Sequence, residues 1–192
     1  MSTSSIYSIK NWTEGETYKK NSIVRRVEEP SDQNNLPTVE FYYSTQEIQE
    51  SKTEPENSPL WGGYFKTGES QKKPYFLWKP SYNNSVTHAP ASQIAKFGDG
   101  YEQRFKKGIF NNYIEIALTF EHRDTNEARC INHFLTARQG TESFHFKHIP
   151  ELHADNTTES SYKKLFVCEK WNSQFVFYNN HTITATFRQV NI

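Results

Sequence analysis

The sequence predicts a mainly β protein with one α-helix, and three observations support this class. Short segments rich in Tyr, Phe, Val and Ile recur along the 192 residues, separated by polar runs or by Gly and Pro. Residues 112–120 alternate strictly, and one of their faces is wholly apolar: Ile114, Ile116, Leu118 and Phe120. Only residues 124–140 show helical periodicity. One helix packed on an antiparallel β-sandwich or barrel fits this order.

Aromatic side chains must form most of the core. Hydrophobic residues make up only 34% of the chain and the mean hydropathy is −0.86, yet aromatic residues reach 15%. Each aromatic side chain can bury roughly 150–250 Å², so a small core remains feasible.

The first third of the chain predicts a small three-stranded β module over residues 1–66. Its strands are expected at 22–27, 39–45 and 60–65. A sheet of this size is marginal alone and would lean on a neighbour. Residues 67–74, which are polar and end in a proline, are expected to form a linker. The denser pattern from 75 to 192 predicts the main domain.

The main domain begins with an explicit hairpin signal. Strands at 94–97 and 101–105 flank Gly98-Asp99-Gly100, and Asp and Gly tolerate the positive φ of tight turns. A further turn is expected at Lys106-Lys107-Gly108. Its two lysine side chains are expected to face solvent rather than contact DNA.

A helix and a group of strands follow. Asp124 is expected to cap the helix with Glu127 three residues later, and Gly140 to end it in the left-handed conformation. One helix face should pack on the sheet: Ile131, Phe134, Leu135 and Arg138. Later strands are expected at 143–147, 163–169, 174–178 and 182–190, with a turn at Trp171-Asn172-Ser173.

Charge and hydropathy exclude several classes of protein. The 22 basic and 22 acidic residues balance, which argues against a free-standing, non-specific nucleic-acid binder. No run of 18 apolar residues is present, so we expect no membrane insertion, and we expect no secretory signal. Cys130 and Cys168 are expected to be reduced, buried thiols.

The sequence shows no catalytic or metal-binding constellation. It lacks the nucleophile elbow, the phosphate-binding loops and the helical zinc motif of common enzymes. His145 and His148 would point to opposite faces of a strand, and nearby His153 does not complete a ligand set. We therefore expect no enzymatic activity, no metal and no cofactor.

At this point a family resemblance becomes visible. The segment FGDGYEQR at 97–104, Gly108-Ile109, the strand IEIALTF, the helical INHFLTARQGTESFHF and the terminal FRQV occur in order. Residues 75–192 thereby resemble the minor tail protein M family of lambda-like tailed phages. The resemblance implies a tail-tube-like fold and a virion protein synthesised in the cytoplasm of the host bacterium.

The resemblance also implies an assembly. Members are distal tail components, so a ring, expected to be hexameric, would join the tail tube protein to the tail-tip hub protein. Its channel would hold the tape-measure protein and pass phage DNA during ejection. We expect the hairpin to lie at the interface between subunits or in the lumen of the ring. The candidate residues for these contacts are Phe97, Gly98, Asp99, Gly100, Tyr101, Glu102, Gln103, Arg104 and Gly108. Gly98 and Gly100 would set the turn, and Asp99, Glu102 and Arg104 would make polar contacts.

The N-terminal module leaves two interpretations open. It loosely resembles small aromatic-rich carbohydrate-binding modules, in which case Trp12, Tyr43 and Trp61 would stack on a glycan at the host surface. Alternatively, it docks on another tail protein or widens the ring. Exposed Trp residues would favour glycan adhesion, and burial of all three residues would favour a plain core. A tail protein that degrades the cell wall is a third class, for which no nucleophile is visible.

Overall fold

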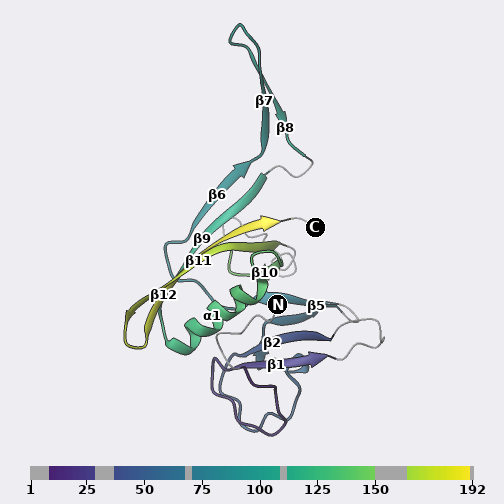
Figure 1. Ribbon diagram of the computed structural model, residues 1–192, viewed down its shortest axis with the longest axis vertical. Coiled ribbons are helices and arrows are strands. Elements are labelled where there is room, and N and C mark those ends of the chain that lie inside the picture. The colour runs from purple at the N-terminus through teal and green to yellow at the C-terminus, as the bar shows by residue number, and fades with distance from the viewer. Residues whose placement is uncertain (1–8, 29–36, 68–70, 109–111, 150–163, 191–192) are drawn as a thin grey trace.

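The computed structural model describes residues 9–28, 37–67, 71–108, 112–149 and 164–190 (Figure 1). Within these ranges the protein is mainly β and contains one α-helix, which confirms the predicted class. The strands form a three-stranded sheet, a seven-stranded sheet and a separate two-stranded hairpin.

The three-stranded sheet lies near the N-terminus, as predicted. It consists of β1 (Ile23–Glu28), β2 (Thr38–Ser44) and β3 (Trp61–Gly62), all antiparallel, and a short 3-10 turn, η1 (Pro55–Asn57), precedes β3. A small aromatic cluster packs within this part of the chain: Tyr18, Val24, Tyr42, Ile48 and Trp61.

The strand expected at 60–65 is divided at Gly63. This glycine has a φ of 115°, and a Cβ there would lie 2.9 Å from the Phe41 carbonyl oxygen. Side chains do not tolerate that approach. The chain therefore leaves the small sheet after β3 and enters the large sheet as β4 (Tyr64–Thr67).

The linker expected at 67–74 is wrong where the structure describes it, at residues 67 and 71–74, while residues 68–70 lie outside the described residues. β5 (Gln71–Phe76) pairs with β4 in an antiparallel hairpin, with Tyr64 opposite Pro74 and Thr67 opposite Gln71. The polar composition of this segment suggested a linker, but ladder hydrogen bonds depend on the backbone and not on side-chain polarity.

Seven strands form the main sheet, in the order β4-β5-β10-β11-β12-β9-β6. The remaining members are β6 (Ser85–Pro90), β9 (Asn112–Arg123), β10 (Phe144–Phe146), β11 (Leu165–Phe177) and β12 (Asn180–Val190). All neighbours are antiparallel except β5 and β10, which run parallel. The even positions from Ile114 to Phe120 are buried, as the alternation predicted.

The expected turn at Trp171-Asn172-Ser173 is also wrong. These residues lie inside β11 and pair with Ala185, Thr184 and Ile183 of β12. Asn and Ser suggested a turn, but pairing along a long hairpin satisfies their backbone groups. The reversal occurs at Tyr178-Asn179, where Asn179 has a φ of 55°.

Helix α1 (Thr125–Arg138) starts as predicted. The Asp124 carboxylate accepts hydrogen bonds from the amides of Asn126 and Glu127, both at 2.8 Å. Its end is shifted by one residue, because Gln139 is the left-handed cap with a φ of 52° and Gly140 is a second left-handed residue. The residues expected to face the sheet are all buried: Ile131, Phe134, Leu135 and Arg138.

Phe76 lies at the centre of the main core between the large sheet and α1. Its side chain is fully buried, and its ring centroid is 5.0–6.1 Å from the centroids of six neighbours. These neighbours come from strands, the helix and the segment after β5: Trp78, Phe120, Phe134, Phe144, Phe146 and Phe187. Aromatic packing thus supplies most of the burial, as the composition indicated.

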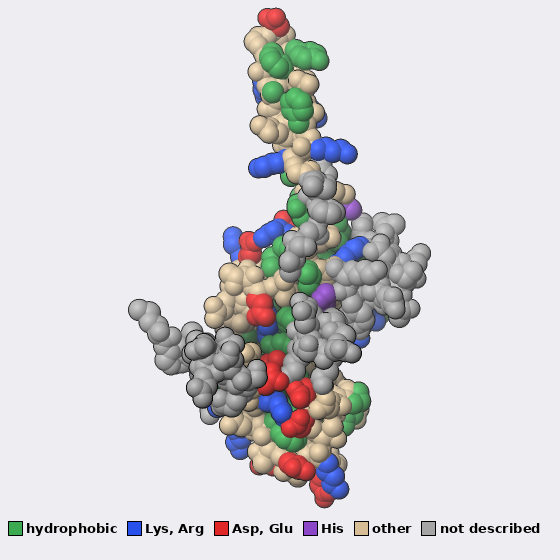
Figure 2. Space-filling view, turned by 90° about the vertical axis from the view of Figure 1, so that its right-hand side faces the viewer, with side chains coloured by type: hydrophobic (Ala, Val, Ile, Leu, Met, Phe, Trp, Pro, Cys, Tyr) green, Lys and Arg blue, Asp and Glu red, His purple; other side chains and the backbone are tan. Residues whose placement is uncertain are grey.

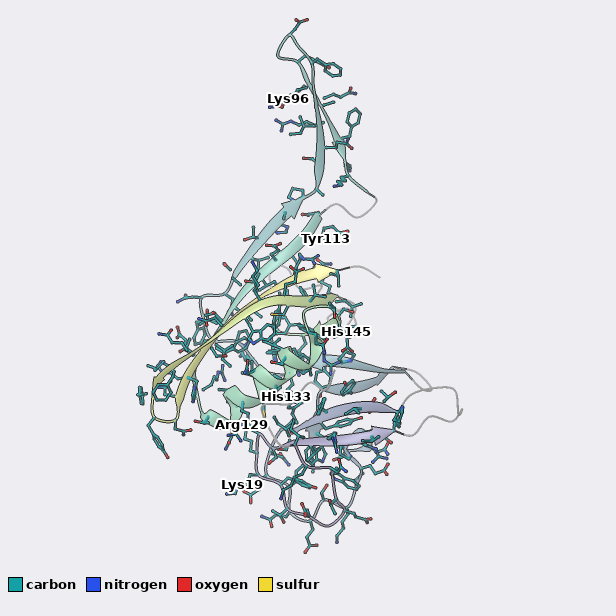
Figure 3. All side chains as sticks on the ribbon, in the orientation of Figure 1. Lys19, Lys96, Tyr113, Arg129, His133 and His145 are labelled. Carbon is teal, nitrogen blue, oxygen red and sulfur yellow. The ribbon has the colours of Figure 1, made fainter. Side chains whose placement is uncertain are left out.

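The small sheet packs on the other side of α1. Alternation along β2 sends Tyr42 into the small cluster and Tyr43 into the main core. The Tyr43 hydroxyl hydrogen-bonds His133 Nδ1 of α1 at 3.0 Å, and the ring of Phe41 contacts the His133 ring edge-to-face. Figure 3 labels His133 on α1. Burial lowers the pKa of His133 to about 4, with a smaller contribution from nearby Arg138.

Replacing the central aromatic residue should cost much stability. We expect Phe76→Ala to lower the free energy of unfolding by about 3–5 kcal/mol, because the lost ring leaves a cavity in a fully buried site. Phe175→Ala removes a ring that is 66% exposed and should change it by less than about 0.5 kcal/mol. Urea unfolding of both variants measures the difference. Equal losses of unfolding free energy would contradict the central position of Phe76 in the core.

The buried imidazole should make stability depend on pH. Its folded pKa of about 4 lies below its ordinary value of 6.5, so the unfolded chain binds the proton more readily. The stability is therefore complete above about pH 6.5 and decreases as the pH falls toward 4. Between pH 7 and pH 5 the wild type should lose about 2 kcal/mol more than His133→Gln in urea unfolding. If the free energies of unfolding of the two proteins changed equally with pH, the buried imidazole would not be the cause.

Candidate functional site

The predicted hairpin projects from the body of the molecule as an arm, here residues 91–107 (Figure 1). Its strands are β7 (Ser92–Lys96) and β8 (Glu102–Lys106), which pair with each other and form a sheet of their own. The arm continues from β6 and β9 of the large sheet, and the Lys107 amide donates to the Ala91 carbonyl at its base. The sequence located this element correctly.

The end of the arm is a three-residue turn. The Phe97 amide donates to the Tyr101 carbonyl at 2.8 Å, and the two rings lie 6.0 Å apart. Gly100 has a φ of 81° and provides the left-handed residue that closes the turn. Gly98 does not adopt a left-handed φ, so only Gly100 of the predicted pair requires glycine for its backbone conformation.

One face of the arm carries no charge. Residues paired across the two strands share a face, which here consists of Gln93, Ala95, Phe97, Tyr101, Gln103 and Phe105. Its three aromatic residues are largely open to solvent: Phe97 is 52% exposed, Tyr101 69% and Phe105 47%. Figure 2 shows hydrophobic side chains along the arm, far from the buried core. This face resembles an interface more than an ordinary surface.

The opposite face of the arm is charged. It comprises Ser92, Ile94, Lys96, Glu102, Arg104 and Lys106. Glu102 and Arg104 form an ion pair with each other on this face. The polar contacts that we expected at a subunit seam would therefore lie on the opposite side from the aromatic rings. Asp99 is exposed in the turn, and Gly108, with a φ of 82°, follows the arm.

A second exposed aromatic patch lies at the reversal between β11 and β12, which we call the tip, residues 175–178. Phe175, Val176, Phe177 and Tyr178 are 66%, 49%, 58% and 90% exposed. The sequence pattern predicted only a strand at residues 174–178. Four consecutive apolar residues without alternation, next to a turn, indicate an exposed patch of this kind.

Contacts with the start of α1 hold the tip in place. The Asn179 side-chain oxygen accepts a hydrogen bond from the Thr125 amide at 3.0 Å. The Thr125 hydroxyl and His181 Nε2 are 3.1 Å apart, and the His181 ring contacts the Phe175 ring at 5.6 Å. The exposed aromatic side chains therefore stand on an anchored turn.

Two of the three residues considered for glycan stacking are unavailable to a sugar. Tyr43 and Trp61 are 1% and 4% exposed and belong to the two cores. Stacking on a sugar needs an open ring face, which burial removes. Trp12 is half-buried, and its indole N–H donates to the Ser51 hydroxyl at 3.1 Å. Trp12 and Trp61 therefore stabilise the small cluster of the module, and Tyr43 joins the module to the main core.

The histidine and cysteine residues that the sequence singled out lie mostly in the interior of the protein, where the structure describes them. His145 is buried in β10 and His148 is half-buried, while His153 lies outside the described residues. Across the described ranges no three His, Cys, Asp or Glu side chains are grouped to hold a metal. Cys130 and Cys168 are buried free thiols, as expected, and burial raises the pKa of each to about 12.

Comparison with known proteins decides the family. The family described as phage minor tail protein matches residues 74–191, which is more than half of the chain. The chain belongs to this family. No curated protein matches the chain significantly.

The matched region contains most of the structure described above. It spans the large sheet from the end of β5 onward, the arm, α1 and the tip. This minor tail protein is thus a structural component of the phage tail, where it contacts other tail proteins. The three-stranded sheet precedes the matched region. Among the described residues, no helix has the length and apolar character needed to cross a membrane.

The charged face of the arm should contribute little to the stability of the subunit. Arg104→Ala should lower the free energy of unfolding by less than about 0.5 kcal/mol, because its pair with Glu102 is solvent-exposed. Arg123→Ala is the matched control, because this arginine is largely buried and bonds both Glu127 and the Lys79 carbonyl at 2.8 Å. That variant should lose roughly 1–2 kcal/mol. Chemical denaturation compares them, and a loss at Arg104 as large as at Arg123 would contradict this assignment.

Proposed function

We propose that this minor tail protein forms a hexameric ring at the distal end of the tail tube. The ring joins the tube to the tail-tip hub and lines the channel through which DNA is ejected. The arm carries the proposal: its three exposed aromatic rings share an uncharged face that the body of its own subunit does not cover. Burying such a face against another subunit removes apolar area from water without stranding a charge.

The two faces of the arm fit two environments. We assign the uncharged face to the seam between subunits and the charged face, with Lys96, Glu102 and Arg104, to the water of the channel. This face carries three basic side chains, Lys96, Arg104 and Lys106, and one acidic side chain, Glu102, whereas the chain as a whole has equal numbers of basic and acidic residues. The ion pair between Glu102 and Arg104 offsets part of the positive charge of this face.

The N-terminal module fits a supporting role in this assembly. Its β2 strand inserts Tyr43 into the main core and packs on α1, so the module forms part of the subunit body. We propose that it widens the ring or docks on another tail protein. Burial of Tyr43 and Trp61 supports this role over glycan adhesion.

Imaging of the purified protein tests the ring. Negative-stain images should show closed rings with a central hole, and native mass spectrometry of the same sample should give the mass of a hexamer. Arg104→Ala should form the same rings, because the charged face is outside the seam. A compact dimer without a hole would contradict the proposal, and loss of rings in Arg104→Ala would contradict the assignment of the two faces.

A further inference from the structure

We propose that the uncharged face of the arm of one subunit docks on the tip, residues 175–178, of a second copy of the chain. This inference rests on the proposed ring and specifies the surfaces that join its subunits. The large hydrophobic side chains exposed among the described residues are concentrated in these two hairpins, which hold eight of the eleven. They are Ile94, Phe97, Tyr101, Phe105, Phe175, Val176, Phe177 and Tyr178.

A single subunit cannot bring the two surfaces together. Strand β9 runs between them, because Asn112 pairs with Pro90 near the base of the arm and Arg123 pairs with His181 near the tip. Twelve residues of extended chain span roughly 40 Å. Figure 1 shows the arm projecting from one end of this sheet and the β11–β12 reversal at the other. The contact must therefore join different copies.

Two different surfaces on one chain are what a ring requires. A closed ring repeats a heterologous contact. In such a contact one surface of each subunit binds a different surface of the next subunit. The arm is the projecting surface, and the tip, held by Thr125 at the start of α1, is the anchored one. Two identical surfaces would instead favour an isologous dimer.

The two surfaces also match in chemistry and size. Residues 171–187 contain no Asp, Glu, Lys or Arg, and the aromatic face of the arm is uncharged as well. Docking would therefore bury no unpaired charge from these segments. The exposed parts of the six aromatic rings amount to roughly 700–800 Å². With the surrounding backbone and polar groups, this approaches the 1,200–2,000 Å² or so of a specific interface.

Cysteine cross-linking tests the contact directly. Tyr101→Cys places a thiol on the aromatic face of the arm, and Tyr178→Cys places one on the tip. The native Cys130 and Cys168 are buried, so they should not compete for a short bismaleimide. An equal mixture of the two variants should give a cross-linked dimer, and each variant alone should give little. Lys96→Cys, on the charged face, mixed with Tyr178→Cys is the matched control and should cross-link less.

Affinity gives a second readout. Replacing Phe97 and Phe105 together with Ser should weaken self-association by at least about tenfold, because aromatic residues dominate the energy of such interfaces. The double substitution of Lys96 and Lys106 by Ser should change the affinity of self-association by less than about threefold. Sedimentation of all variants over a concentration series measures both effects.

The outcomes separate this inference from the proposed ring. Closed rings without arm-to-tip cross-links overturn the contact but keep the ring. Arm-to-tip cross-links in open filaments support the contact and overturn closure. Cross-links from Tyr101→Cys alone show an arm-to-arm contact and overturn the inference. A chain that stays monomeric at high concentration also overturns it, and the receiving surface would then belong to a different tail protein.

Discussion

The structure depends on the burial of one helix between two sheets. Helix α1 packs Phe134 among the aromatic residues of the large sheet and presents His133 to β2 of the small sheet. The small sheet is too limited to form a stable core by itself, and the helix provides the surface that completes it. Arg138 extends the same contact, since its guanidinium donates to the Tyr64 hydroxyl at 2.6 Å and lies over the Phe134 ring. Module, helix and large sheet are therefore a single packed body.

That body fixes the positions of the two exposed aromatic surfaces. The arm grows from the end of β6 and β9, while the tip is the reversal of β11 and β12 beside the start of α1. Strands β7 and β8 of the arm form a sheet of their own, but they continue from β6 and β9, which are paired in the large sheet, as are β11 and β12 on either side of the tip. The separation of the arm and the tip is set by the length of β9, so they can serve as the two unlike surfaces of a repeated contact. Packing in the core thus fixes where the two exposed aromatic surfaces lie relative to each other.

The same aromatic composition serves two purposes in this chain. The rings of Phe76, Phe144 and Phe187 are fully buried and hold the sheet to the helix, whereas the rings of Phe97 and Phe177 stand more than half exposed. A sequence count cannot separate these groups, because the residue types are identical. Burial in the structure separates them into rings that form the core and rings that are exposed to solvent.

Local patterns in the sequence determined much of the protein. The alternation of 112–120, the Asp124 cap and the Gly98-Asp99-Gly100 turn each depend on contacts within a few residues, and each was predicted at nearly its observed position. The family resemblance, carried by residues 97–104 and the helix that follows, was likewise visible before the fold was known.

Tertiary structure decided the features that depend on distant residues. Residues 71–74 are strand because β4 lies beside them, and residues 171–173 are strand because β12 pairs with them. Tyr43 and Trp61 are buried because α1 and the small cluster cover them, although their spacing also suits an exposed glycan platform. The apolar residues of the tip differ from those of the core only in their exposure, which depends on the tertiary structure. Propensity and turn chemistry act over a few residues, while pairing and burial depend on which distant segments the fold brings together.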